Sequence, residues 1–177
     1  GPNEPKDPVK HEGVFASHYD EGRMVRFVDP NIPWSITAKR SIQRFSQLQM
    51  DSGIKFFTTS GYLGLQGPES LDYFEGSEFS AKTVNANLKR ISAVEIRKDY
   101  PFLSIKDNTI GLVETELAGH ISPRDMVKAQ TKMAQKFGAD IVEQEVERIS
   151  VNNNAVEIRL RNNEKLFADK VLVATGA

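Results

Sequence analysis

Ten consecutive residues near the beginning of the chain concentrate side chains that could bind an anion. Residues 17–26 have the sequence Ser-His-Tyr-Asp-Glu-Gly-Arg-Met-Val-Arg. Arg23 and Arg26 are three residues apart. On a helical turn they would lie on one side and could hold a carboxylate or a diphosphate by paired N–H donation. The alternative is a solvated charged turn, in which Asp20 and Glu21 neutralise the two guanidinium groups.

The last seven residues form a second candidate site. The run from Val171 to Ala174 is continuously apolar, which is typical of a strand buried on both faces of a parallel sheet. The small residues Thr175, Gly176 and Ala177 follow it. Open α/β sheets bind ligands at the carboxyl ends of their strands, where small residues let a ligand approach the backbone. An ordinary strand followed by a glycine turn is the alternative.

Composition excludes several other kinds of chemistry. The chain has 177 residues and no cysteine, so disulfides, thiolate metal sites and a thiol nucleophile are excluded within it. Its three histidines lack the spacing of metal ligands. A net charge of -1 gives no basic field for nucleic acid. The apolar runs are far shorter than the roughly 20 residues that span a bilayer. We therefore expect no metal site, no nucleic-acid partner and no membrane partner.

The first two thirds of the chain are expected to combine helices with short strands. Three prolines predict an irregular arm over residues 1–13. Trp34, Ala38, Ile42, Phe45 and Leu48 recur at helical spacing. They predict one helix with a common apolar face, starting near Asn31 and Pro33 and stopping at Ser52-Gly53. The later elements are a hairpin of strands 54–58 and 62–66, then helices over 81–90 and 93–98.

The last third is expected to begin with a helix and continue as strands. Strands are predicted over 109–115 and 117–121. Ser122 as N-cap, Pro123 in the first turn and Gly138 as the stop predict a helix between them. Beyond it, a period of two predicts strands over 139–143, 146–151 and 155–160, with a turn at 152–154. The buried strand 171–174 would come last.

Six segments, taken in order, resemble FAD-dependent amine oxidoreductases of the D-amino acid oxidase and sarcosine oxidase type. The resemblance runs from about Glu4 to the last residue. The segments are 17–26, the helix with Trp34, Thr59-Ser60-Gly61-Tyr62-Leu63, Gly119-His120-Ile121-Ser122-Pro123, Val146-Glu147-Arg148-Ile149, and the run from Asp169 to Ala177.

The resemblance implies roles for the two arginines and their neighbours. Arg26 would hold the substrate carboxylate, and Arg23, with Ser17 and His18, would lie beside the flavin or its diphosphate. Arg26 and Arg23 are therefore the catalytic candidates.

The resemblance also implies cofactor contacts elsewhere in the chain. Val146 would contact adenine through its backbone, and Thr175, Gly176 and Ala177 would form the small-residue strand end against the cofactor. Glu4 would accept hydrogen bonds from the ribose hydroxyls, with Gly1 as the other residue that could occupy that position.

The implied fold is α/β, a partial Rossmann-like FAD-binding domain with substrate-side helices and antiparallel strands. Residues 1–31 would connect to the FAD domain, residues 32–121 would form the substrate side, and residues 122–177 would return to the FAD domain. The family's glycine-rich dinucleotide fingerprint is absent from this sequence. The chain is therefore expected to be an internal segment, inactive by itself.

The implied activity of the parent enzyme is FAD-dependent oxidation of the C–N bond of a small-molecule amine, an amino acid or N-methyl amino acid. Oxidation of a 2-hydroxy acid, or a hydroxylation, is the second possibility because related flavin folds do both. A non-catalytic interaction module that keeps the fold is the third.

Overall fold

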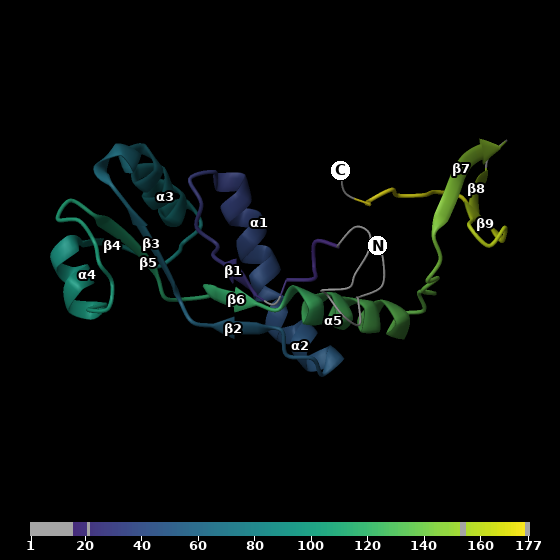
Figure 1. The fold of residues 1–177 in the computed structure, drawn as a ribbon, viewed down its shortest axis with the longest axis horizontal. Coiled ribbons are helices and arrows are strands. Elements are labelled where there is room, and N and C mark those ends of the chain that lie inside the picture. The colour runs from purple at the N-terminus through teal and green to yellow at the C-terminus, as the bar shows by residue number, and fades with distance from the viewer. Residues whose placement is uncertain (1–15, 21, 153–154, 176–177) are drawn as a thin grey trace. The chain divides into compact units, whose positions relative to one another are not determined.

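The computed structural model describes residues 16–20, 22–152 and 155–175. The chain divides into two compact units, a larger one over residues 17–136 and a smaller one that contains residues 137–175 (Figure 1). Within the described residues, no helix has both the length and the apolar character that crossing a membrane requires.

The larger unit contains two three-stranded antiparallel sheets. Its strands are β1 (Arg23–Val25), β2 (Phe57–Thr59), β3 (Tyr62–Gln66), β4 (Leu88–Ser92), β5 (Ile110–Glu114) and β6 (Gly119–Ile121). In one sheet β6 lies between β1 and β2, and in the other β5 lies between β3 and β4. Glu114, the last residue of β5, is aligned with Tyr62 on β3 and with Leu88 on β4. The central strand of the second sheet is thus fixed on both sides.

Helices surround these sheets. They are α1 (Ile32–Gln43), α2 (Phe45–Ser52), the short 3-10 helix η1 (Pro68–Ser70), α3 (Leu71–Thr83), α4 (Ala93–Asp99) and α5 (Pro123–Lys136). Helix α4 packs on β4 and β5, whereas α1 packs on α2 and α3. A buried cluster joins the end of β1 to α1 and α3, and its members are Phe27, Val28, Ile42, Ala81 and Val84. This cluster fixes the segment that leads from β1 into α1.

The helix predicted from Asn31 to Ser52 is present, but it is divided at Arg44 into α1 and α2. The Asn31 side chain accepts a hydrogen bond from the Trp34 N–H, and Gly53 ends α2 with a φ of 70°. The expected common apolar face is only partly correct, because Trp34 is 71% exposed. The face that packs on the core begins one turn later, at Ala38.

The predicted hairpin of strands 54–58 and 62–66 is wrong. Strand β2 pairs with β6 and strand β3 pairs with β5, so the two strands belong to different sheets. The N–H groups of Ser60 and Gly61 both donate to the Ala118 carbonyl oxygen, which holds the crossing between the sheets. Figure 1 shows β2 running on into β3 while β5 runs on into β6. The partners of β2 and β3 both come from residues 110–121. The turn residues between β2 and β3 give no sign of this pairing.

The helix predicted over 81–90 is also wrong. Helix α3 starts at Leu71 and ends at Thr83, and the strand β4 follows over Leu88–Ser92. Asn85 adopts a φ of 53°, which breaks the helix, and pairing with β5 then imposes an extended backbone. The short helix predicted over 93–98 is confirmed as α4, and the strands predicted over 109–115 and 117–121 are confirmed as β5 and β6.

The helix predicted between Ser122 and Gly138 is confirmed as α5. The Ser122 Oγ accepts a hydrogen bond from the Asp125 N–H at 3.3 Å, and Gly138 has a φ of 91°. Ala129 and Met133 are buried on one face of the helix. Phe137 is 81% exposed, since it lies beyond the last helical residue.

The smaller unit is a three-stranded antiparallel sheet in the order β7-β8-β9. Its strands are β7 (Val146–Asn152), β8 (Ala155–Leu160) and β9 (Lys165–Ala168). The two strands predicted around the turn at 152–154 are thus confirmed. Residues 139–143 and 171–174 are not strands in the structure, and Leu172 is 89% exposed. A buried strand needs neighbours that bond its backbone and cover its faces, and the run 171–174 has no ladder with the described residues.

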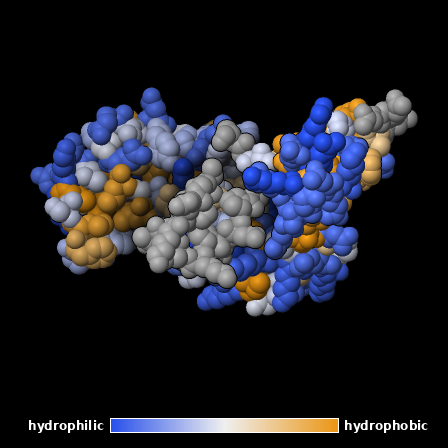
Figure 2. Space-filling model, turned by 45° about the vertical axis from the view of Figure 1, so that its right-hand side comes forward, coloured by the Kyte–Doolittle hydropathy of each residue, from blue (hydrophilic) through white to orange (hydrophobic). Residues whose placement is uncertain are grey.

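Large apolar side chains also remain exposed at the end of the larger unit that carries α4. Figure 2 shows apolar residues gathered there, and the exposed members include Val94 and Phe102.

Candidate functional site

Arg26 lies in the extended segment between β1 and α1, and its side chain is only 26% exposed. Its Nη1 donates to the Val28 carbonyl oxygen at 2.6 Å. Its Nη2 donates to Asp29 Oδ2 at 3.0 Å, which also forms an ion pair. Asp29 is held in turn, because its Oδ1 accepts from the Asn31 N–H. The guanidinium group is therefore fixed by its own segment.

Two tyrosine rings flank the Arg26 guanidinium. Its central carbon lies 5.7 Å from the centre of the Tyr62 ring and 6.0 Å from the centre of the Tyr73 ring, within the range of a cation–π contact. Tyr62 comes from β3 and Tyr73 from α3. Burial raises the pKa of Tyr62, the nearby Tyr73 raises it further, and the positive charge of Arg26 opposes the shift. The Tyr62 phenol is thus an uncharged donor at neutral pH.

A buried carboxylate holds the backbone on the other side of Arg26. Glu114 is fully buried, and its Oε1 accepts from the Phe27 N–H at 3.0 Å while its Oε2 accepts from the Val28 N–H at 3.1 Å. Burial raises the pKa of Glu114, and the two backbone N–H donors and the Arg26 charge oppose the shift. Arg26, Tyr62, Tyr73 and Glu114 come from four separate segments, and we call them the Arg26 cluster.

The Arg26 cluster can bind an anion with an apolar or aromatic neighbour. A guanidinium group presents a planar fork of N–H donors that matches a carboxylate. Partial burial strengthens such a contact, because the local dielectric is lower than that of water. The Val28 carbonyl oxygen and Asp29 already accept from the two arms of the fork, so a carboxylate ligand of Arg26 would compete with both.

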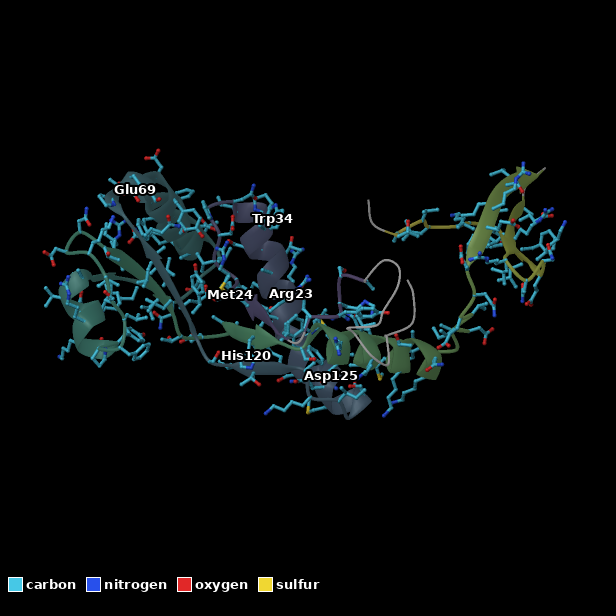
Figure 3. All side chains as sticks on the ribbon, viewed as in Figure 1. Arg23, Met24, Trp34, Glu69, His120 and Asp125 are labelled. Carbon is cyan, nitrogen blue, oxygen red and sulfur yellow. The ribbon has the colours of Figure 1, made fainter. Side chains whose placement is uncertain are left out.

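An open groove borders the same segment. It has a volume of about 350 Å³ and lies between the segment 24–29 and α1, with Met24, Arg26, Asp29 and Trp34 among its lining residues. Figure 3 shows Met24 on β1 and Trp34 near the start of α1. Met24 is 63% exposed, and Trp34 is also exposed. Arg26 is therefore among the lining residues of a groove whose walls are largely apolar.

Arg23 does not join the Arg26 cluster. It is the first residue of β1, and so no helical turn brings the two arginines to one side. Arg23 Nη2 donates to the Ser17 carbonyl oxygen at 2.6 Å, and the side chain forms an ion pair with Asp20. The charged-turn interpretation thus describes Arg23, while Arg26 is the more buried cation. Glu21 lies outside the described residues.

The segment with Ser17 and His18 is anchored by α5. Arg124 donates from Nε and Nη2 to the Tyr19 carbonyl oxygen, at 2.8 and 2.6 Å. The His18 and Tyr19 rings are in edge contact, with their centres 4.8 Å apart. Ser17 and His18 thus lie on an anchored segment just before β1, and Arg23, the first residue of β1, bonds to that segment through the Ser17 carbonyl oxygen.

The remaining predicted site residues lie in the smaller unit or outside the described residues. Val146 is the first residue of β7, which is an edge strand of its sheet in the described part of the chain. The register of β7 and β8 shifts between Val146 and Arg148. Thr175 is exposed and has no regular secondary structure. Glu4, Gly176 and Ala177 lie outside the described residues, as does Gly1.

Sequence reasoning missed Glu114, Tyr62, Tyr73 and Asp29 as site residues. Tyr62 belongs to one of the segments that carry the resemblance, and Glu114 carried a signal of its own, because it is a charged residue at the end of the otherwise apolar strand Ile110–Glu114. A charge in such a position needs partners. Its partners are 86 and 87 residues away in the sequence, so the pattern alone could not name them. Among residues 16–20, 22–152 and 155–175, no group of three His, Cys, Asp or Glu side chains is placed to hold a metal ion.

Comparison with known proteins identifies a family and a shared fold. The family described as "FAD dependent oxidoreductase" matches residues 12–177. An N-methyl-L-tryptophan oxidase from Citrobacter koseri is 24% identical over 166 residues, which cover 91% of this chain and 43% of that protein. The corresponding enzyme from Escherichia coli O1:K1 is 26% identical over the same shares. The chain thus spans less than half the length of these curated relatives.

Solved structures with similar folds include oxidases. NikD, described as an unusual amino acid oxidase essential for nikkomycin biosynthesis, has a TM-score of 0.72 at 16% identity, over 89% of this chain and 40% of that one. A glycine oxidase from Bacillus cereus has a TM-score of 0.66 at 21% identity, over 86% and 44% of the two chains. At these identities the likeness concerns the fold, and it agrees with the expected α/β class.

Proposed function

Because the chain belongs to the family of FAD-dependent oxidoreductases, we propose that its parent protein oxidises the C–N bond of an amino acid or N-methyl amino acid. The N-methyl-L-tryptophan oxidases among its relatives support this choice of substrate class. Because the chain spans 43% of their length, the activity is proposed for the longer protein. The observation that carries the proposal is a largely sheltered guanidinium, that of Arg26, between two tyrosine rings.

In this proposal Arg26 binds the substrate carboxylate. The planar N–H fork fixes the carboxylate in two directions, and fixing one end of a small substrate restricts where its α-carbon can lie. Tyr62 and Tyr73 hold the guanidinium by contact with its faces and keep water from it. The contribution of these residues is positioning. When bound, FAD supplies the redox chemistry by accepting two electrons and the hydrogen of the broken C–H bond.

Some of the residues proposed for the cofactor have features that suit the contacts assigned to them. Val146 lies on an edge strand, whose outer backbone groups can bond to a base as the proposed adenine contact requires. The Arg23 side chain is 50% exposed, so a diphosphate could reach its guanidinium. Ser17 and His18 lie on the same segment. Glu4, Thr175, Gly176 and Ala177 remain proposed contacts from the resemblance.

The test of Arg26 compares two substrates in the intact protein. We predict that Arg26→Ala lowers kcat/KM for an N-methyl amino acid by about 100-fold, because a charge-assisted contact is lost. The amine that lacks the carboxylate should be oxidised at nearly the wild-type rate. Arg40→Ala is the matched control, since Arg40 is an exposed arginine of α1 outside the groove lining. An equal effect of Arg26→Ala on both substrates would remove Arg26 from this role.

The reaction class is tested separately from Arg26. The purified intact protein should be yellow, and N-methyl amino acids or amino acids should bleach its flavin absorbance without oxygen. Bleaching by 2-hydroxy acids alone would favour the second reaction class. A colourless protein would favour the non-catalytic module.

A further inference from the structure

The segment that carries Arg26 depends on a distant acceptor for its backbone. Residues 26–29 have no regular secondary structure, and Phe27 and Val28 are each only 3% exposed. Buried N–H groups need acceptors, and in this segment two consecutive N–H groups point to the same carboxylate, that of Glu114. The path of the backbone directly after Arg26 is therefore set by Glu114.

Glu114 is itself held rigidly. It ends β5, the central strand of its sheet, and it is aligned with Tyr62 on one neighbouring strand and with Leu88 on the other. The same strand pair thus fixes Glu114 and Tyr62, one of the two rings against Arg26. The sheet β3-β5-β4 in this way determines the position of the Arg26 backbone relative to that ring.

We infer that Glu114 is a positioning residue, which holds Arg26 beside Tyr62 and Tyr73 so that its guanidinium can bind the substrate carboxylate. Glu114 acts through the backbone of Phe27 and Val28 and does not touch the substrate. The inference rests on the proposed function, because it assigns Arg26 to the substrate carboxylate.

A purely structural role for Glu114 explains less. A neutral acceptor could satisfy both buried N–H groups without the cost of placing a charge in the interior, as Gln49 Oε1 does for the N–H groups of Phe56 and Phe57. A carboxylate offers two acceptor oxygens and is charged, and it can hold two adjacent N–H groups at once. Burial works against this charge, as the raised pKa of Glu114 indicates. A charged carboxylate at position 114, in spite of this cost, is consistent with a need to place the backbone of residues 26–28 precisely.

The experiment is a double-mutant cycle in the intact FAD-loaded protein. Glu114→Gln keeps the size of the side chain but replaces one acceptor oxygen by an NH₂ group. We expect KM for an N-methyl amino acid to rise at least about 10-fold, with little change in the rate for the amine that lacks the carboxylate. In the Arg26→Ala background, Glu114→Gln should cause almost no further rise in KM, because both substitutions remove the same contact with the substrate carboxylate.

Glu78→Gln is the matched control. Glu78 is a partly buried carboxylate that also accepts two N–H groups, those of Arg90 at 2.8 Å each, but it lies outside the Arg26 cluster. It should leave KM unchanged. If Glu114→Gln does not fold, Glu114→Asp enters the same cycle, because it keeps both oxygens and shortens the reach.

The outcomes separate the two ideas. An effect of Glu114→Gln that is equally large with and without Arg26, or equal for both substrates, overturns the positioning role. No effect of Glu114→Gln, when Arg26→Ala itself discriminates between the substrates, also overturns it and leaves the proposed function intact. If Arg26→Ala does not discriminate, the proposed function fails.

Discussion

The Arg26 guanidinium forms an ion pair with Asp29 in its own segment, and it is also the group to which we assign the substrate carboxylate. Asp29 takes one arm of the guanidinium fork, and both side chains are about one quarter exposed. The ion pair holds the arginine side chain in place before the substrate binds. The negative charge of Asp29 also weakens the electrostatic attraction between Arg26 and a substrate carboxylate. Asp29 is thus both a support and a competitor.

This competition predicts the effect of Asp29→Asn. The asparagine keeps an oxygen for the Asn31 N–H but removes the opposing charge. A partly exposed ion pair is worth up to about 1 kcal/mol, so KM for carboxylated substrates should fall by about fivefold. Steady-state kinetics of the intact enzyme measure this. Asp72→Asn, an exposed aspartate at the start of α3, serves as the control. A higher KM in Asp29→Asn would mean that Asp29 chiefly supports Arg26.

At the scale of elements, the crossing between the two sheets depends on a close backbone approach. A Cβ atom on Gly119 would lie 2.0 Å from the Thr58 carbonyl oxygen and 2.8 Å from the Ser60 nitrogen. Strands β6 and β2 can pair at this distance only because residue 119 has no side chain.

Gly119→Ala should therefore separate β6 from β2 and lower the free energy of unfolding by about 3 kcal/mol. Urea unfolding of the protein would show the loss. Gly22→Ala is a suitable comparison, because the nearest atom to its added Cβ would be the Ile121 carbonyl oxygen at 4.0 Å. Equal stability of the two variants would contradict the close approach.

Helix α4 begins with a reciprocal pair of hydrogen bonds. Ser92 Oγ accepts from the Glu95 N–H, and Glu95 Oε2 accepts from the Ser92 N–H at 2.8 Å. Hydrogen bonds to the Glu95 carboxylate from the Ser92 N–H and hydroxyl, and then from Lys89, lower the pKa of Glu95 to about 2. Removing the cap by Ser92→Ala should cost about 1 kcal/mol of unfolding free energy.

The lowered pKa also gives a pH dependence. A carboxyl whose folded pKa lies below its unfolded value stabilises the fold above the unfolded value, and this stabilisation is lost as the pH falls towards about 2. The difference between the wild type and Glu95→Gln, measured by urea unfolding, should thus shrink between about pH 5 and about pH 2. A constant difference would mean that the carboxylate charge has no part in the cap.

Local signals located α4 and α5 but not α3, and non-local pairing decided the strands of the larger unit. Ser122, Pro123 and Gly138 lie at the ends of one helix, so their chemistry alone located α5. The partner of β3 is β5, which lies more than forty residues further along, and no residue near Gly61 records that choice. The same limit applies to the site: Arg26 was found from its type and spacing, whereas Tyr73 and Glu114 became neighbours only through the fold.

At the scale of the whole molecule, several apolar side chains of the smaller unit are exposed. They are Val151, Phe167, Leu172 and Val173. The continuous run 171–174, predicted as a buried strand, has a composition typical of a covered position. The division into regions 1–31, 32–121 and 122–177 stays a prediction.

We predict that the 177-residue chain alone does not retain FAD. The glycine-rich turn that binds a diphosphate at the start of a helix is not in this sequence, so the chain offers only part of a dinucleotide site. Gel filtration of the chain with added FAD should give a colourless protein peak, whereas the intact protein should elute with its flavin. Stoichiometric flavin on the isolated chain would contradict this prediction.

The bond between Glu114 and the backbone after Arg26 also bears on the order of folding. Its two ends are 87 residues apart, and closing so large a loop is entropically unfavourable until other contacts have formed. Helix α5 and the turn of β7 and β8 can form early from nearby residues. Arg26 would reach its final place among the last events, so the carboxylate binding that we propose for it would be acquired only when the larger unit is nearly complete.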